Sequence, residues 1–155
     1  MIEIIKGDLL THDAQYITHQ TNCISDGSVA GIAAAIFKKY PYSNTYLNRK
    51  QRSVPGTIDV FTEGRHIINM NSQYYPGRFN DAYENDTEVM RKKYFHQCLL
   101  KIAKLPDLQS IAFPYLIGCG LGGGNWDHYE QMLNNFAKYV FDKQKTKTFI
   151  VRLDQ

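Results

Sequence analysis

Residues 114–126 read PYLIGCGLGGGNW, which is the most informative stretch of this 155-residue chain. An apolar run at residues 110–114 leads into it and is typical of a buried strand, and an amphipathic helical pattern follows it. Five of the seven residues at positions 118–124 are glycines. Glycines let the backbone approach a ligand closely and leave N–H groups free to bind an anion. The stretch therefore predicts a phosphate- or diphosphate-binding loop, to which we expect the positive dipole end of the following helix to contribute.

Two familiar phosphate-binding motifs do not describe this loop. It lacks the Gly-Lys-Ser/Thr ending of a P-loop, and no lysine is placed to reach a γ-phosphate. Gly118, Gly120 and Gly123 match the spacing of the dinucleotide fingerprint, but no complete βαβ unit can follow so close to the C-terminus. Cys119 lies in the loop without the Cys-x5-Arg pattern of cysteine phosphatases, so we do not expect a nucleophilic thiol.

A second strand–loop–helix junction lies nearer the N-terminus, where residues 18–35 read THQTNCISDGSVAGIAAA. The small residues that open its helix again leave N–H groups for an anion. Asn22 offers a donor and an acceptor at the carboxyl end of the strand, where open α/β sheets bind ligands, although a turn residue is the alternative. His19 is either a core histidine or a candidate for proton transfer. Asp8 ends the first strand and is either an acceptor for an exocyclic amine or a turn carboxylate.

The hydrophobic pattern alternates between strands and helices along the chain. We predict strands at residues 1–6, 15–20, 57–62, 65–70, 110–114 and 148–153. We predict a helix at residues 29–40 and two more after capping patterns, one formed by Asn85 with Glu88 and one by Asp127 with Glu130. The alternation indicates an α/β fold in which a mixed central sheet lies between helices. We expect one domain that spans residues 1–155.

Composition excludes several classes of protein. The net charge of +3 is too small and too scattered to indicate nucleic-acid binding by itself. Cys23, Cys98 and Cys119 show neither zinc-site spacing nor a disulfide framework. No apolar run approaches the roughly 18 residues that span a bilayer, and the first residues lack the apolar segment of a signal peptide. We therefore expect a cytoplasmic monomer with no membrane partner.

These segments occur in the order in which macrodomains carry them, and the chain resembles that family over most of its length. The resemblance rests on residues 6–9 (KGDL), 19–22 (HQTN), 31–33 (GIA) with 37–41 (FKKYP), and 117–123 (IGCGLGG) with Trp126. It implies a three-layer α/β/α sandwich that binds ADP-ribose, with Asp8 on the adenine amino group, Asn22 on the distal ribose and both glycine-containing loops on the diphosphate. The ligand-binding residues implied in this way are Asp8, Leu9, Asn22, Gly31, Ile32, Ala33, Gly118, Cys119, Gly120, Leu121, Gly122 and Gly123.

The resemblance also implies an activity. Gln73 and Gly122 stand where some family members carry a catalytic lysine and aspartate, so we do not expect a lysine adduct. The pattern is closer to that of small ADP-ribose 1″-phosphate phosphatases, which implies hydrolysis of the terminal phosphate without a metal or cofactor. The expected catalytic residues are Asn22, which would orient the distal ribose, and His19, which would transfer a proton. Three side chains after the middle strand are expected to wall that ribose: Asn71, Tyr74 and Tyr75.

Two alternatives stay open at this point. The chain can be a module that binds ADP-ribose or ADP-ribosylated macromolecules without turnover. Ser28 and Val29 favour this reading, because they stand where hydrolytic members often carry a histidine and a glycine. The chain can also be an ADP-ribosyl hydrolase that removes ADP-ribose from protein or nucleic acid.

Overall fold

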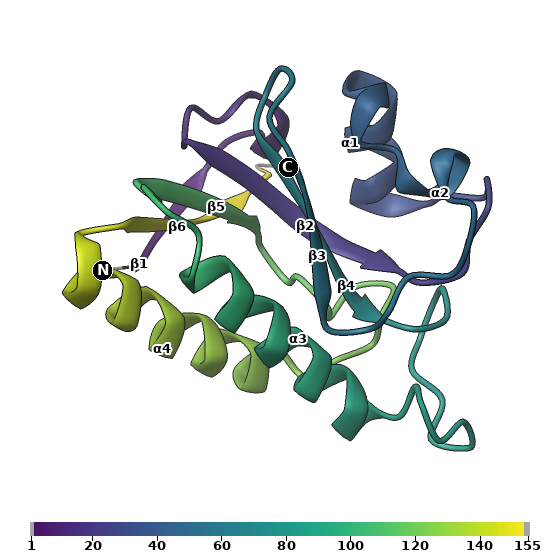
Figure 1. Ribbon diagram of the computed structural model, residues 1–155. Coiled ribbons are helices and arrows are strands. Elements are labelled where there is room, and N and C mark those ends of the chain that lie inside the picture. The colour runs from purple at the N-terminus through teal and green to yellow at the C-terminus, as the bar shows by residue number, and fades with distance from the viewer. Residues whose placement is uncertain (1, 154–155) are drawn as a thin grey trace.

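The computed structural model describes residues 2–153, and a six-stranded sheet of order β1-β6-β5-β2-β4-β3 forms its centre (Figure 1). The strands are β1 (Ile2–Lys6), β2 (Tyr16–Asn22), β3 (Thr57–Phe61), β4 (Ile67–Gln73), β5 (Ser110–Pro114) and β6 (Lys147–Arg152). Neighbouring strands pair in parallel, except that β3 pairs antiparallel with β4 as the predicted hairpin. The sheet is therefore mixed, and its five parallel strands all end at one edge.

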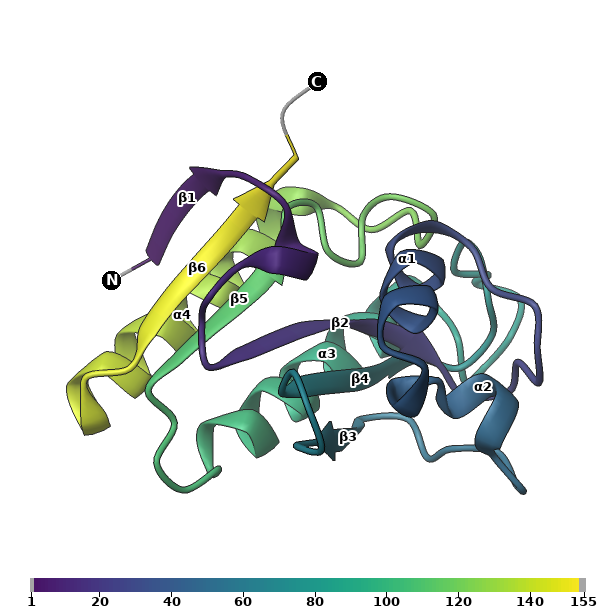
Figure 2. The same cartoon turned by 90° about the horizontal axis from the view of Figure 1, so that it is seen from above.

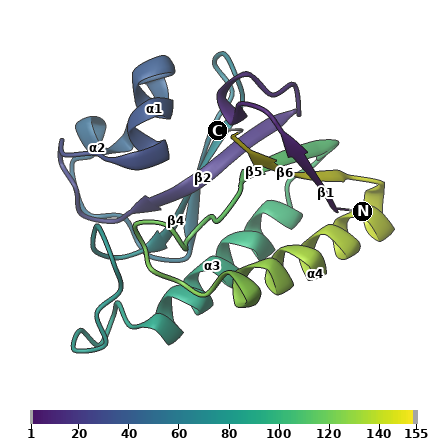
Figure 3. The same cartoon turned by 180° about the vertical axis from the view of Figure 1, so that it is seen from behind.

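Helices cover both faces of the sheet, which confirms the expected three-layer α/β/α fold (Figures 1 and 3). On one face lie α1 (Gly31–Lys39) and the short α2 (Thr45–Asn48). On the other face α3 (Glu88–Ala103) and α4 (Trp126–Gln144) lie side by side. Within residues 2–153, none of the helices has both the length and the apolar character that a membrane crossing needs.

Each face of the sheet has its own apolar core. Phe95 of α3 belongs to the same cluster of packed side chains as Phe113 of β5. Ile36 of α1 belongs to a second cluster with Ile17 of β2. All four side chains are fully buried, and burial of a side chain of this size contributes about 2 kcal/mol. The two cores make the sheet a rigid platform for the loops at its edge.

Two helix starts differ from the capping patterns in the sequence. Thr87, not Asn85, caps α3, and its side chain accepts a backbone N–H at 3.0 Å. Asn125, rather than Asp127, caps α4, and its side chain accepts the Asp127 N–H at 2.9 Å. In both cases the cap is an extended residue directly before the helix, because its side chain can reach the free N–H groups of the first turn.

Strands β2 and β4 continue two or three residues beyond their predicted ends, to Asn22 and Gln73. The extra residues are mostly polar and buried, and they pair across the two strands. The Thr21 hydroxyl, for example, donates to Asn71 Oδ1 at 2.8 Å. A hydrophobic pattern cannot reveal such residues, because hydrogen bonds between side chains, and not apolar contacts, allow their burial.

Candidate ligand-binding cleft

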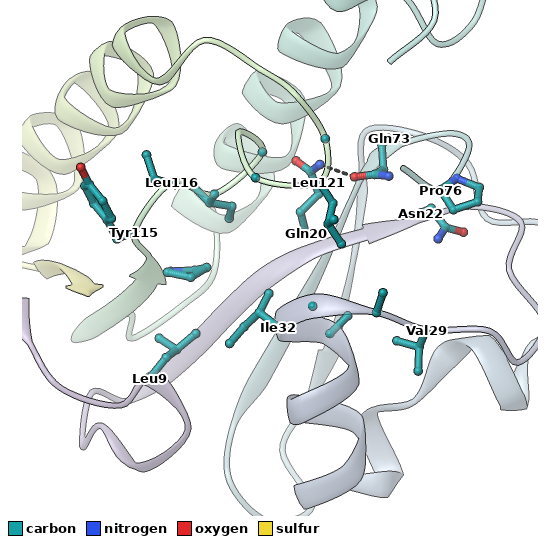
Figure 4. Close-up of a pocket in the computed structure, with 18 of the residues that line it drawn as sticks. Leu9, Gln20, Asn22, Val29, Ile32, Gln73, Pro76, Tyr115, Leu116 and Leu121 are labelled. Atoms are coloured by element: carbon teal, nitrogen blue, oxygen red, sulfur yellow. Dashed lines mark hydrogen bonds between the residues drawn. The ribbon is translucent and has the colours of Figure 1, made fainter. Parts of the chain in front are cut away.

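A cavity of about 670 Å³ opens at the edge of the sheet where the parallel strands end (Figure 4). Residues at or directly after the ends of the five parallel strands line it: Gly7, Asn22, Gln73, Tyr115 and Leu153. Ligands of open α/β sheets bind at this edge. The volume lies within the roughly 300–1,000 Å³ of typical small-molecule sites.

One wall of the cleft is the N-terminus of α1. Ala30 is the extended N-cap, with φ −142°, and it makes no side-chain capping hydrogen bond. No acidic residue lies in the first turn. The N–H groups of Gly31, Ile32 and Ala33 have no hydrogen-bond partner within residues 2–153, and all three residues line the cavity. A helix end with unpaired N–H groups attracts anions, so this wall has the electrostatic character that an anion site requires.

The facing wall is the glycine-rich loop after β5. The loop is closed internally, because the Gly124 N–H donates to the carbonyl of Gly118 at 3.0 Å. The N–H groups of Gly120, Leu121 and Gly122 lack a partner among the described residues, and these three residues also line the cavity. Two rows of three N–H groups, which lie almost ninety residues apart in the chain, therefore border one cavity.

Glycine is required where the two walls approach their neighbours. Gly118 has a φ of +79°, and a Cβ there would lie 2.6 Å from the ring of Tyr129. Gly31 has a φ of +63°, and a Cβ there would lie 3.2 Å from Cδ1 of Leu121 in the facing loop. The loop therefore reaches across to the start of α1, and Figure 2 shows this approach from above. A larger residue at position 31 would strain the backbone and press on the opposite wall.

Asn22 lies at one end of the cleft with its amide held in place. Its Oδ1 accepts the N–H groups of Ile24 at 3.1 Å and Ser25 at 2.8 Å. Its Nδ2 donates to the Tyr46 hydroxyl at 3.0 Å, which also accepts the Asn22 backbone N–H at 2.8 Å. Burial raises the pKa of Tyr46, so the hydroxyl stays protonated at neutral pH. The second Nδ2 hydrogen of Asn22 has no acceptor among residues 2–153.

The opposite end of the cleft holds Asp8. One carboxylate oxygen, Oδ1, accepts the backbone N–H two residues on at 3.0 Å and caps the short 3₁₀ turn Leu9–Thr11. The other oxygen, Oδ2, makes no hydrogen bond within residues 2–153. Tyr115 and Arg152 line the same end, with the guanidinium carbon 5.5 Å from the ring centroid. Figure 4 shows Leu9 and Tyr115 far from Asn22 along the cleft.

Amide side chains form the floor beside Asn22. Gln20 Nε2 donates to Gln73 Oε1 (Figure 4), and Gln73 Nε2 donates to the carbonyl of Tyr75 at 2.8 Å. Pro76 lines this end of the cleft, next to the turn that Gln73 supports. The ionisable residues among the described lining of the whole cleft are Asp8, Tyr46, Tyr115 and Arg152. The end at Asn22 therefore carries hydrogen-bonding groups but no carboxylate, imidazole or ammonium group.

The prediction of the side chains that wall the distal ribose is wrong, because none of the three expected residues lines the cleft. The cavity is lined by Gln73 and Pro76 instead. It is not lined by Asn71, Tyr74 or Tyr75. Asn71 instead lies buried between strands, where its Nδ2 donates to Asp59 at 3.0 Å. The side chains of successive strand residues point to opposite faces, and the sequence did not reveal which set would face the cleft.

Solved structures are similar to this one along nearly its whole length, although no protein-family model and no curated protein matches the sequence. The macrodomain of Mycobacterium tuberculosis DarG has a TM-score of 0.72 at 21% identity, and the match covers 100% of this chain and 99% of that one. The chain has a macrodomain fold. A Bacteroides thetaiotaomicron protein of unknown function is similar to this chain with a TM-score of 0.72 at 24% identity, over 97% of this chain and 98% of that one. A mutant Oceanobacillus iheyensis macrodomain with ADPR has a TM-score of 0.63 at 17% identity, and the match covers 99% of this chain and 86% of that one.

His19 does not line the cleft, so its expected role in proton transfer needs correction. The side chain is fully buried, and its Nε2 donates to Asn69 Oδ1 at 2.7 Å. The tautomer follows from Asn69, whose Nδ2 donates to the carbonyl of Ser43 at 2.8 Å and whose Oδ1 must therefore accept. Burial lowers the pKa of His19 to about 4, so the ring is neutral at pH 7. The structure places a core histidine beneath the strand end that carries Asn22.

Two of the expected binding residues, Cys119 and Gly123, do not line the cavity, whereas the others do. Burial raises the pKa of Cys119 to about 11, so its thiol is protonated at neutral pH. Gly123 instead lies under Arg78, whose Nη1 would be 2.5 Å from an added Cβ. The expected contribution of the α4 dipole is wrong, because Asn125 caps that helix and neither it nor any residue of α4 lines the cleft.

Several lining residues had no functional signal in the sequence. Tyr46 belongs to the short helix α2, more than twenty residues after Asn22, and only the fold brings the two together. Arg152 belongs to β6, whose hydrophobic pattern predicted a strand and nothing more. Within residues 2–153, no group of three or more His, Cys, Asp or Glu side chains is placed to hold a metal ion.

Proposed function

We propose that this macrodomain binds ADP-ribose in the cleft. The observation that carries the proposal is the pair of N–H rows, Gly31 to Ala33 and Gly120 to Gly122, that border one cavity. A diphosphate has two adjacent anionic groups, and each can accept from one row. The uncapped positive end of α1 adds electrostatic attraction.

The two ends of the cleft support the rest of the ligand. At one end the free Oδ2 of Asp8 can accept the exocyclic amine of adenine, beside the apolar surface of Leu9. At the other end the remaining Nδ2 hydrogen of Asn22 can donate to a ribose hydroxyl. The similarity to the Oceanobacillus iheyensis macrodomain with ADPR supports the same class of ligand.

A second candidate function is hydrolysis of the terminal phosphate of ADP-ribose 1″-phosphate. It is favoured by the fixed amide of Asn22, whose remaining hydrogen can orient the distal ribose and a water molecule. Orientation of reactants can lower a barrier by several kcal/mol. Among residues 2–153, Tyr46 is the one titratable side chain that lines that end, so this route relies on positioning by Asn22 and not on proton transfer by His19. The alternatives are binding of ADP-ribosylated macromolecules without turnover and removal of ADP-ribose from them.

Calorimetry with ADP-ribose tests the proposal on wild type and on Gly120→Val. A Cβ at Gly120 meets no atom within 4 Å, and the backbone there has no positive φ, so the substitution fits the ligand-free protein. We expect wild type to bind, and Gly120→Val to lose at least tenfold in affinity because the side chain enters the space of the diphosphate. The same titration with ADP-ribose 1″-phosphate, followed by phosphate release, separates binding from turnover.

Gly27→Val is the matched control, because Gly27 also has an unstrained backbone and lies outside the cleft lining. We expect this variant to bind ADP-ribose like wild type. Absence of a complex between wild type and ADP-ribose at millimolar concentration would reject the proposal. If the protein binds ADP-ribose but releases neither phosphate from ADP-ribose 1″-phosphate nor ADP-ribose from a modified substrate, it is a binding module without turnover.

A further inference from the structure

One buried ion pair connects both loops that close the cleft at its Asn22 end. Arg91 of α3 is 2% exposed, and its Nη2 lies 2.6 Å from Oδ2 of Asp86, which is also buried. Arg91 Nε donates to Oδ1 of the same carboxylate at 3.0 Å. The charge of Arg91 is thereby neutralised, and both Nη atoms have further hydrogens to donate.

Those hydrogens reach the carbonyls of two separate loops. Arg91 Nη1 donates to Gly77 at 2.7 Å and to Gly122 at 3.5 Å, and Nη2 donates to Tyr75 at 3.2 Å. Gly77 and Gly122 both line the cleft, whereas Arg91 and Asp86 do not. One guanidinium group thus holds the turn after β4 and the N–H row of the glycine-rich loop at a set separation.

Two backbone contacts belong to the same unit. The Phe79 N–H donates to the carbonyl of Gly122 at 3.2 Å, so the two loops also touch directly. Oδ1 of Asp86 accepts the N–H of Tyr74 at 3.0 Å, which fixes the exit of β4. Neither cleft loop contains a helix or strand, so these hydrogen bonds, and not secondary structure, fix the positions of the two loops.

We propose that Arg91, held by Asp86, is a positioning residue for the diphosphate and the distal ribose. The inference rests on the proposed binding of ADP-ribose. Arg91 does not touch the ligand; it sets where the N–H groups of Gly120 to Gly122 and the turn at Pro76 lie. Lysine cannot replace it, because an ammonium group is a single point charge and cannot reach three carbonyls and a carboxylate together.

The test compares Arg91→Lys with wild type for two ligands, ADP-ribose and adenosine. Adenosine reaches the Asp8 end of the cleft but has neither a phosphate for the N–H rows nor a distal ribose. We expect Arg91→Lys to lose at least tenfold in affinity for ADP-ribose and less than twofold for adenosine. Loss of stability alone would not produce this split, since both ligands bind the same folded fraction below the unfolding transition.

Arg65→Lys is the matched control. Arg65 also donates to several carbonyls, among them Gln15 at 3.0 Å and His12 at 2.7 Å, but none of these residues lines the cleft. We expect this variant to be less stable, with both affinities within twofold of wild type. If Arg91→Lys does not fold, the double variant Asp86→Leu with Arg91→Met leaves no unpaired buried charge and should show the same split between ligands.

The outcomes separate the two proposals. A wild type that binds no ADP-ribose overturns the proposed function and this inference with it. A wild type that binds, together with an Arg91→Lys variant that keeps its affinity or weakens for both ligands alike, overturns the positioning role alone.

Discussion

His19 shows most clearly how a single side chain takes its properties from the fold. Its pKa of about 4 lies well below the usual 6.5, because burial disfavours the charged ring. His19 is therefore protonated near pH 6.5 in the unfolded chain, but only near pH 4 in the folded protein. Stability from this group is complete above pH 6.5 and falls as the pH drops toward 4.

The first prediction follows from that pH window. When the pH is lowered from 7 to 4.5, the unfolding free energy of wild type should fall by about 2 kcal/mol because of His19, in addition to the effect of other groups. His19→Gln retains a donor for Asn69 and should show a decrease smaller by that amount. Urea denaturation of both proteins at the two pH values measures it. Equal pH dependence in the two proteins would show that His19 is not buried as a neutral group.

Among the helices, α1 is unusual because its N-terminus has no capping side chain and faces the cleft. An extended N-cap residue with a carboxylate normally stabilises a helix by about 1 kcal/mol. Ala30→Asp should therefore raise the unfolding temperature, yet it should weaken ADP-ribose binding at least tenfold because the carboxylate takes the place of the diphosphate. Thermal unfolding and calorimetry on the same variant measure both effects.

The control for this trade-off is the capped helix α3. Thr87→Ala removes the hydrogen bond to the N–H of Met90 and should lower stability by about 1 kcal/mol, with no change in affinity. If Ala30→Asp binds ADP-ribose as well as wild type does, the start of α1 is not part of the anion site.

Across the whole fold, the proposal requires that two distant segments respond to one ligand. The unpaired N–H groups of residues 31–33 and 120–122 should exchange rapidly in the free protein. ADP-ribose should slow both sets, with the same midpoint in a ligand titration, because a single diphosphate accepts from both. Hydrogen exchange read by NMR measures this. Protection of only one set would mean that the ligand does not bridge the two loops.

Local sequence was sufficient to predict most of the elements and both of the small-residue loops that line the cleft. The run at residues 110–114 and the glycines after it are a strand and a loop at the cleft, because apolar periodicity and glycine conformations act over a few residues. Asp8 and Asn22 also follow from their places at strand ends. The helix caps were predicted less well, since several residues within one turn can each serve as a cap.

The side chains that fix the geometry of the cleft could not be read from the sequence. Arg91 lies in an amphipathic helix where an arginine is normally solvated, and its partners come from two loops: Gly77 and Asp86 before that helix, and Gly122 after β5. Residues of other elements, such as Phe37, bury His19. This burial decides whether its ring is charged and whether it can transfer a proton in the cleft. Helices, strands and turns depend on neighbouring residues, so the sequence by itself specifies them. Contacts between loops and the pKa of a buried group depend on packing between distant segments, which exists only once the sheet has formed.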